Sequence, residues 1–265
     1  MATALITGAT GGIGRELAAL FAHDGHDLIL TARDESRLDR LAAQLRERFG
    51  VDVATVAVDL ARPDAAARLH RYARTHGLTV DFLVNNAGFG DWSGYLETDW
   101  GKTSAMMQVN MVALAELTYR FGRDMRARGH GRILNVSSVA STMAGPWMAT
   151  YFATKAFVRS LTEAVAHELR GTGVSVTCVC PGPTTTGFEQ AAAMGGAARN
   201  FFTMTRPASA RSLARYAYGK MMRGSVLAYH GPTAKAGVFA EHVLPRWLTR
   251  RVAAFMNGGR PSASS

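Results

Sequence analysis

The sequence predicts an α/β fold in which helices cover both faces of an open parallel sheet. Short apolar runs alternate with longer helical patterns along most of the chain. A glycine-rich segment stands between the first apolar run and the first helical pattern. The chain has 265 residues, of which 48% are hydrophobic and 19% charged, and this is ample for a single domain with a large core.

The first predicted strand, residues 3–7, leads into the segment TGATGGIG, and a helical pattern follows from Ile13 to His23. Glycines allow a tight turn and let backbone N–H groups approach a phosphate, while the helix N-terminus adds a favourable dipole. An ordinary strand-to-helix turn would not need four glycines. The residues predicted to hold a phosphate-bearing cofactor here are Gly8, Thr10, Gly11, Gly12, Ile13 and Gly14.

The second predicted strand, Leu28 to Thr31, ends beside Arg33, and a helix continues to about Phe49. In a dinucleotide-binding fold the end of this strand faces the adenosine ribose. An acidic residue would accept a hydrogen bond from the ribose 2′-hydroxyl, whereas a guanidinium can hold a 2′-phosphate in a bidentate manner. We therefore expect NADPH to be preferred over NADH. The alternative is that Arg33 is an ordinary surface arginine.

The third strand, 53–58, ends in Asp59 and Leu60, which are expected to border the adenine, and a helix follows over 63–76. The fourth strand, 82–84, ends in the turn NNAG. Ligands of an open parallel sheet bind at the carboxyl ends of its strands. The residues predicted to bind the cofactor in this turn are Asn86, Ala87 and Gly88.

Three residues around the fifth strand, 132–136, form the predicted chemical centre. Ser138 follows the strand, and Tyr151 and Lys155 lie four residues apart at the start of a helix, so they share one face of it. A cation about 4–5 Å from a phenol stabilises the phenolate by roughly 4 kcal/mol at an effective dielectric near 20. We therefore expect the pKa of Tyr151 to lie near neutral, where general acid/base catalysis is most effective. The alternative is a packed tyrosine beside a surface lysine.

Asn110 lies in an apolar stretch of a long predicted helix, 103–128. Taken alone, this pattern favours a satisfied core amide. Cys178 and Cys180, in the strand 174–179, point to the same face and cannot form an unstrained bridge with each other. They indicate buried thiols of a reduced, cytoplasmic protein, and they supply too few ligands for a metal site.

The turn CPGPTTTGF follows this strand, and its threonines are suited to hydrogen-bond a cofactor amide or phosphate. The cofactor-binding residues predicted there are Pro181, Gly182, Thr184 and Thr186. The small-residue segment 189–206 is interpreted as a mobile lid over a pocket. A helix over 209–223 and a last strand near 225–229 complete the predicted sheet.

The net charge is +10, but arginines are scattered through helical segments and no nucleic-acid-binding motif accompanies them. A basic surface with sites for an anionic cofactor is the favoured explanation, and no nucleic-acid partner is expected. No apolar run is long enough for a spanning helix.

These motifs, in this order and spacing, resemble the short-chain dehydrogenase/reductases over about residues 1–230. The resemblance implies a single-domain, doubly wound Rossmann fold with a parallel sheet of about seven strands and an NAD(P)-dependent oxidoreductase. TGATGGIG also satisfies the pattern of the longer epimerase-like branch, which the chain length and NNAG disfavour. The tail is similar to the extensions of bacterial acyl-chain and steroid ketoreductases.

The resemblance also implies the roles of the central residues. Tyr151 exchanges a proton with the substrate oxygen, and Ser138 holds that oxygen. Lys155 lowers the pKa of Tyr151 and binds the nicotinamide ribose, and Asn110 positions a water that links Lys155 to solvent. The expected function is NADP(H)-dependent interconversion of a ketone or aldehyde and an alcohol. The alternative is a non-catalytic NADP(H)-binding sensor or scaffold on the same fold.

The pocket lining is expected from 89–95, 140–148 and 187–204. Aromatic residues and methionines in these ranges favour an acyl-chain, steroid-like or aromatic ketone, unless they only pack the lid; both interpretations stay open at this point. They are Phe89, Trp92, Tyr95, Met143, Trp147, Met148, Phe188, Phe201, Phe202 and Met204.

The predicted organisation is a catalytic domain over 1–238, a helical extension over 239–256 and a disordered tail over 257–265. Apolar residues recur along the extension at helical spacing. They must cover the pocket, meet a second subunit or rest on a lipid surface. Packing against the body or a partner subunit is favoured, because Pro245 interrupts the stripe, and a soluble homo-oligomer, dimer or tetramer, is expected.

Overall fold

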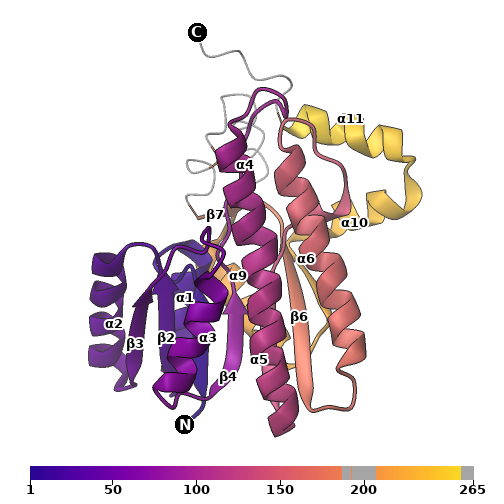
Figure 1. Cartoon of the computed structure of the whole chain (residues 1–265). Coiled ribbons are helices and arrows are strands. Elements are labelled where there is room, and N and C mark those ends of the chain that lie inside the picture. Colours follow the sequence, from indigo (N-terminus) through magenta and orange to yellow (C-terminus); the bar gives the residue numbers. More distant parts are fainter. Residues whose placement is uncertain (187–191, 193–206, 258–265) are drawn as a thin grey trace.

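A computed structural model describes residues 1–186, 192 and 207–257 of the chain (Figure 1). Seven parallel strands form one sheet in the order β3-β2-β1-β4-β5-β6-β9, which confirms the predicted fold. Their bounds are β1 Thr3–Thr7, β2 Asp27–Ala32, β3 Val53–Ala57, β4 Val80–Asn85, β5 Gly131–Val136, β6 Val174–Pro181 and β9 Leu227–His230. The strand order reverses at β1, which pairs with both β2 and β4, so a crevice for ligands is expected at its carboxyl end.

Helices cover both faces of the sheet. Successive strand residues face opposite sides, so that Ala4 and Ile6 of β1 pack in one core cluster and Leu5 in the other. Helices α1, α2 and α9 supply the first cluster, and α3, α5 and α6 the second. The helix bounds are α1 Gly12–His23, α2 Glu35–Phe49, α3 Ala65–Thr75, α4 Trp100–Met107, α5 Leu114–Arg128, α6 Ala149–Glu168, α9 Ala210–Met222, α10 Pro232–Val243 and α11 Arg246–Met256.

The long helix predicted over 103–128 is present but carries one widened turn. A π-helical segment, Gln108–Ala113, joins α4 to α5 and contains Asn110. Such a turn inserts an extra residue into the helical repeat, and it commonly marks a functional position. The sequence pattern gave no sign of this turn, because the apolar spacing on either side of it stays helical.

The chain after β9 differs most from the prediction. Helix α10 begins at Pro232, which suits the first helical position because it has no N–H to satisfy. It runs across residue 238, where the sequence predicted the extension to begin. The chain then breaks at Leu244–Pro245, and α11 follows as a separate helix at the edge of the molecule (Figure 1). The predicted lid over 189–206, apart from Ala192, and residues 258–265 of the predicted disordered tail lie outside the described residues. Asn257, which was predicted to begin that tail, is buried and hydrogen-bonded instead.

Two further features of the chain bear on its expected setting. Cys178 and Cys180 are buried, free thiols with their sulfurs 3.8 Å apart, as their spacing predicted. Within the described ranges, no helix has both the length and the apolar character needed to cross a bilayer.

Candidate active site

A cavity of about 1190 Å³ opens at the carboxyl ends of the central strands. It contains every predicted site residue except Gly14 and Asn110. The predicted residues that line it are Gly8, Thr10, Gly11, Gly12, Ile13, Arg33, Asp59, Leu60, Asn86, Ala87, Gly88, Ser138, Tyr151, Lys155, Pro181, Gly182, Thr184 and Thr186. Parallel pairing therefore brings together residues from seven separate segments of the chain.

The glycine-rich loop is a close-fitting cradle. Gly8 has a φ of 64°, and a Cβ there would come within 3.0 Å of the Asn86 amide nitrogen and of the Ala87 Cα. A Cβ on Gly14 would stand 2.3 Å from the carbonyl oxygen of Gly8. Asn86 Nδ2 donates to the carbonyl oxygens of Thr7 and Gly8, at 3.0 and 3.2 Å. The NNAG turn thus holds the glycine-rich loop in place. Gly14 does not line the cavity but lets α1 pack closely against Gly8.

The N-terminus of α1 faces the same cavity without a side-chain cap. Its N-cap residue is Gly11, and no side chain among the described residues caps the helix. A Cβ on Gly11 would meet nothing within 4 Å. Unpaired N–H groups and the helix dipole favour an anion at this end. The cradle therefore fits the phosphates of a dinucleotide.

Arg33 stands exposed just after β2, at the rim of the cavity. It has no hydrogen-bond or ion-pair partner among the described residues. The neighbouring carboxylate of Asp34 is turned into α2, where it caps the helix by accepting from Arg37 N at 3.0 Å and pairs with the Arg37 guanidinium at 3.3 Å. Arg33 is thus left available for an anionic ligand, with Arg37 beside it on the cavity wall.

The turn after β6 closes over the glycine loop. A Cβ on Gly12 would lie 2.9 Å from Thr186 Cβ, so the two segments are in close contact. Thr184 Oγ1 donates to the carbonyl oxygen of Gly182 at 2.9 Å, which stabilises the turn. On the far side of the loop, Asp59 Oδ1 accepts from Ala61 N at 3.0 Å and is held beside Leu60.

Ser138, Tyr151 and Lys155 meet at the centre of the cavity. Ser138 Oγ accepts from Ala140 N at 3.1 Å and is hydrogen-bonded to the Tyr151 phenol. Lys155 Nζ donates to the carbonyl oxygen of Val136 at 3.0 Å and lies 5.7 Å from the centre of the Tyr151 ring. Ser137 Oγ donates to the Lys155 carbonyl at 2.8 Å, so α6 is fastened to the end of β5. The predicted meeting of hydroxyl, phenol and ammonium is present.

The prediction that the pKa of Tyr151 lies near neutral was wrong. Burial raises the pKa of Tyr151 to about 12, because removing the phenol from water penalises the phenolate more than the Ser138 hydrogen bond stabilises it. Burial also lowers the pKa of Lys155 to about 8, because removing the ammonium from water penalises its charged form. Desolvation, not the attraction between the two groups, therefore dominates here.

Asn110 does not line the cavity but holds the loop that does. Its Nδ2 donates to the Phe89 carbonyl at 2.9 Å and to Thr154 Oγ1 at 3.1 Å, and its Oδ1 accepts from Phe89 N at 3.1 Å. The widened helical turn presents this amide to the chain after β4. A Cβ on Gly88 would lie 3.0 Å from Asn110 Oδ1 and 3.4 Å from Lys155 Nζ, so these groups gather around Gly88. The predicted water-positioning role stays a prediction.

The cavity continues past Tyr151 into an apolar chamber. Of the pocket residues predicted from sequence, Phe89, Met143 and Met148 line it. Trp92 and Trp147 do not, and Tyr95 is more than half exposed, so the prediction was wrong for these three. Phe188, Phe201, Phe202 and Met204 lie outside the described residues. The two C-terminal helices also line the chamber, in agreement with the expected packing of the extension against the body, through Gly237, Ala240, Leu244, Thr249, Val252, Ala253, Met256 and Asn257.

Hydrogen bonds fasten the end of α11, where Asn257 lines this chamber. Trp92 Nε1 donates to the Asn257 carbonyl at 2.8 Å, and Asn257 Nδ2 donates to the Pro146 carbonyl at 2.7 Å. Ser93 N donates to the carbonyl of Trp147 at 2.9 Å. Three segments, after β4, before α6 and after α11, are thereby joined. We call this arrangement the Asn257 latch.

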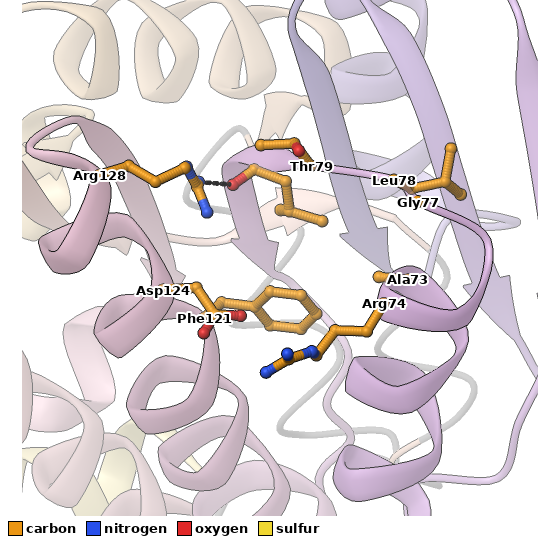
Figure 2. A pocket seen from close by; sticks show the side chains of 9 residues that line it. Ala73, Arg74, Gly77, Leu78, Thr79, Phe121, Asp124 and Arg128 are labelled. Atoms are coloured by element: carbon orange, nitrogen blue, oxygen red, sulfur yellow. Dashed lines mark hydrogen bonds between the residues drawn. The ribbon is translucent and has the colours of Figure 1, made fainter.

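A second, smaller cavity of about 220 Å³ lies between α3 and α5 at the amino end of β4 (Figure 2). Arg74, Asp124 and Arg128 surround it, and Arg128 Nη2 donates to the Val80 carbonyl at 2.7 Å. It contains no predicted site residue and lies away from the edge of the sheet where the strands' carboxyl ends gather. The large cavity is therefore the candidate active site.

Comparison with known proteins points to one family. The sequence model of the short chain dehydrogenase family matches residues 2–195. A 7β-hydroxysteroid dehydrogenase of Collinsella aerofaciens is 36% identical over 182 residues, covering 69% of this chain and 68% of the relative. A short-chain dehydrogenase from Sphingobium yanoikuyae, solved in complex with NADPH, is 31% identical with a TM-score of 0.81, covering 91% and 94% of the two chains. A solved 7β-hydroxysteroid dehydrogenase is 29% identical with a TM-score of 0.85, covering 96% of each chain.

The cradle geometry predicts different outcomes for two glycine substitutions. Gly14→Ala places a methyl group against the Gly8 carbonyl and should lower the melting temperature by several degrees, because the backbone of the loop must shift. Gly11→Ala meets no protein atom, so it should leave the melting temperature nearly unchanged and weaken dinucleotide binding. Thermal unfolding and cofactor titration of both variants measure this, and equal effects of the two would contradict the cradle.

Proposed function

The chain belongs to the short-chain dehydrogenase family, and on this premise we propose that it is an NADP(H)-dependent reductase of apolar ketones that acts as an alcohol dehydrogenase in reverse. The observation that carries the proposal is the continuity of one cavity. It runs from the glycine cradle, past Ser138, Tyr151 and Lys155, into an apolar chamber. A cofactor in the cradle and a ketone in the chamber would meet at these three side chains. NADPH oxidation measured with a panel of ketones tests the proposal.

The proposed roles follow from the chemical state of each side chain. A phenol with a pKa of about 12 is protonated at neutral pH, so Tyr151 is suited to donate a proton to the carbonyl oxygen as the alcohol forms. Ser138, hydrogen-bonded to that phenol, would donate to the same oxygen and stabilise its developing charge. NADPH, when bound, supplies the hydride that reaches the carbonyl carbon. In the reverse, oxidative direction the same side chain would take the proton back.

Lys155 would return a proton to Tyr151 and hydrogen-bond the nicotinamide ribose. Its ammonium, with a pKa of about 8, gives up a proton more readily than an exposed lysine does. One of its hydrogens is engaged by the Val136 carbonyl, and this fixes the direction of the side chain. Asn110 would position the loop residue Phe89 and, through its remaining acceptor capacity, a water near Lys155.

The preference for NADPH is proposed from Arg33. Its guanidinium has no partner within the described part of the chain, and the nearby Asp34 carboxylate is committed to Arg37 and to the α2 N-terminus. An arginine so placed suits a 2′-phosphate and gives no acceptor for a 2′-hydroxyl. The NADPH complex of the related Sphingobium enzyme is consistent with this choice.

The proposed substrate is a bulky apolar ketone, of which a steroid is the leading example. The chamber walls carry Phe89, Met143 and Met148 on one side and side chains of α10 and α11 on the other. The related proteins named as 7β-hydroxysteroid dehydrogenases support a steroid-like ligand. Acyl-chain and aromatic ketones belong in the same assay panel.

Two wider predictions stay with this proposal. Free, buried Cys178 and Cys180 suit a reduced, cytoplasmic setting. A homo-oligomer, dimer or tetramer, is also predicted. Exposed apolar side chains that could meet a partner subunit are Val112 of the π-helical segment, Tyr119 of α5 and Phe157 of α6.

Replacing Tyr151 with Phe tests the proton donor. The ring stays and the hydroxyl is lost, so kcat should fall by at least about 100-fold while NADPH binding is retained. Steady-state kinetics and cofactor titration measure the two effects. A fully active Tyr151→Phe protein would remove this residue from the mechanism, and an inactive wild type that binds NADPH would favour the sensor alternative.

Arg33→Asp tests the cofactor preference. Loss of a charge-assisted contact to the 2′-phosphate should weaken NADPH binding by about 10- to 100-fold, with a smaller effect on NADH. The matched control is Arg40→Asp. Arg40 lies on α2 and does not line the cavity, so its replacement should change neither affinity. The assignment fails if titration shows that the wild type already prefers NADH.

Asn257→Ala and Asn257→Asp test the latch. Both remove the donor to the Pro146 carbonyl, and the aspartate keeps the side-chain size. KM for a bulky ketone should rise by up to about ten-fold in both variants, since a buried neutral hydrogen bond is lost, while NADPH affinity stays near wild type. A change in NADPH affinity as large as that in KM would contradict a role confined to the chamber.

A further inference from the structure

We propose that the C-terminal helices dock onto an anionic lipid surface through their outer face. The outer face of each helix consists of exposed residues at four-residue steps, which are Lys235, Phe239 and Val243 on α10, and Trp247, Arg251 and Phe255 on α11. All six are exposed, with Phe239 at 70% and Phe255 at 77%. Steps of four place residues on one side of a helix, so each of the two helices presents one stripe to solvent. The proposal concerns binding and does not depend on the reaction proposed above.

The same two helices use their opposite sides for the cavity. Ala240 and Leu244 at the first helix, and Thr249 and Ala253 on the second, line the chamber. The two buried side chains of α11, Thr249 and Ala253, are small, whereas the exposed ones include a tryptophan and a phenylalanine. Packing against the body of the protein therefore accounts for the inner residues and leaves the outer aromatic residues without a function in the fold.

Exposed apolar side chains are concentrated at this end of the molecule. Among the described residues, five of the thirteen exposed large hydrophobic side chains lie on α10 and α11. Three more, Tyr95, Leu96 and Trp100, lie in or next to the loop that Trp92 ties to Asn257. Single exposed apolar residues are ordinary, but a cluster of this kind marks an interaction surface.

The charge of the surface selects the occupant. The sequence from Pro232 to Asn257 contains four basic residues, Lys235, Arg246, Arg250 and Arg251, and one acidic residue, Glu241, for a net charge of +3. A second copy placed with its outer face against this one would bring arginine against arginine. Anionic headgroups, in contrast, complement arginines that flank an apolar face, and tryptophan favours the membrane–water interface.

The expected binding is peripheral and reversible. Two short helices with a few apolar anchors bind only marginally by burial, so the arginines must supply much of the affinity. Each contributes about a five-fold gain near an anionic surface, and this contribution is screened by salt. Because the inner sides of the same helices line the chamber, the mouth of the chamber would stand next to the lipid phase.

Vesicle flotation tests the proposal with the full chain. Vesicles of phosphatidylcholine mixed with phosphatidylglycerol should carry the protein upward at low salt, and vesicles of phosphatidylcholine alone should not. Arg250→Gln combined with Arg251→Gln should weaken binding by about 25-fold, from five-fold for each arginine. Trp247→Ser combined with Phe255→Ser should also release the protein, because it removes the apolar anchors.

The matched control is Arg40→Gln combined with Arg48→Gln. It removes the same charge from exposed positions of α2, at the opposite edge of the molecule from α11 (Figure 1), and should leave vesicle binding near wild type. All variants should keep their melting temperature and their NADPH affinity, because none of the substituted residues lines the cavity. A failure of the proposed reaction would leave the vesicle result unchanged.

Three outcomes would overturn the proposal. The first is a wild-type protein that does not float with anionic vesicles at low salt. The second is an equal loss of binding in the α2 control, which would mean that only net charge matters. The third is a smaller particle by light scattering for Trp247→Ser/Phe255→Ser without any vesicle binding by the wild type, which would make a second copy of the chain the occupant.

Discussion

The common direction of all seven strands is the constraint on which the site depends. It brings Gly8, Asn86 and Ser138, which follow three different strands, to one edge of the sheet. Buried amides reinforce the alignment, since Asn85 of β4 donates to Asn135 of β5 at 2.9 Å and Asn135 donates to Thr162 of α6 at 3.0 Å. Unpaired, each of these groups would be costly in the core, so the strands and α6 are held in a single register.

Most of the fold and the identity of the central residues could be predicted from the sequence, because both depend on local patterns. Apolar runs predicted the strands, and the glycine spacing predicted the cradle. The four-residue step predicted that Tyr151 and Lys155 share one face of a helix. The remainder depends on three-dimensional surroundings that no local pattern records. Asn110 acts through a widened turn inside an otherwise regular helix. The tail has lining residues and exposed residues interleaved along it, and only the break at Pro245 and the packing of each helix separate them.

The central tyrosine shows how burial competes with charge. Proximity of an ammonium and a phenol suggests mutual stabilisation of their ions, but both groups lie out of water, and the desolvation of each outweighs their attraction. The protein therefore holds a neutral phenol next to a lysine that loses its proton easily. A neutral phenol in this position fits the proton-donating role that we propose for Tyr151.

The Asn257 latch has a consequence for how the protein matures. The phosphate cradle is built from the first part of the chain, whereas the chamber closes only when Asn257 reaches the carbonyl of Pro146 and accepts from Trp92. A chain emerging from the ribosome therefore contains the glycine cradle long before it contains the last residues that line the chamber. The cavity therefore lacks part of its lining until Asn257, near the end of the described chain, has been added.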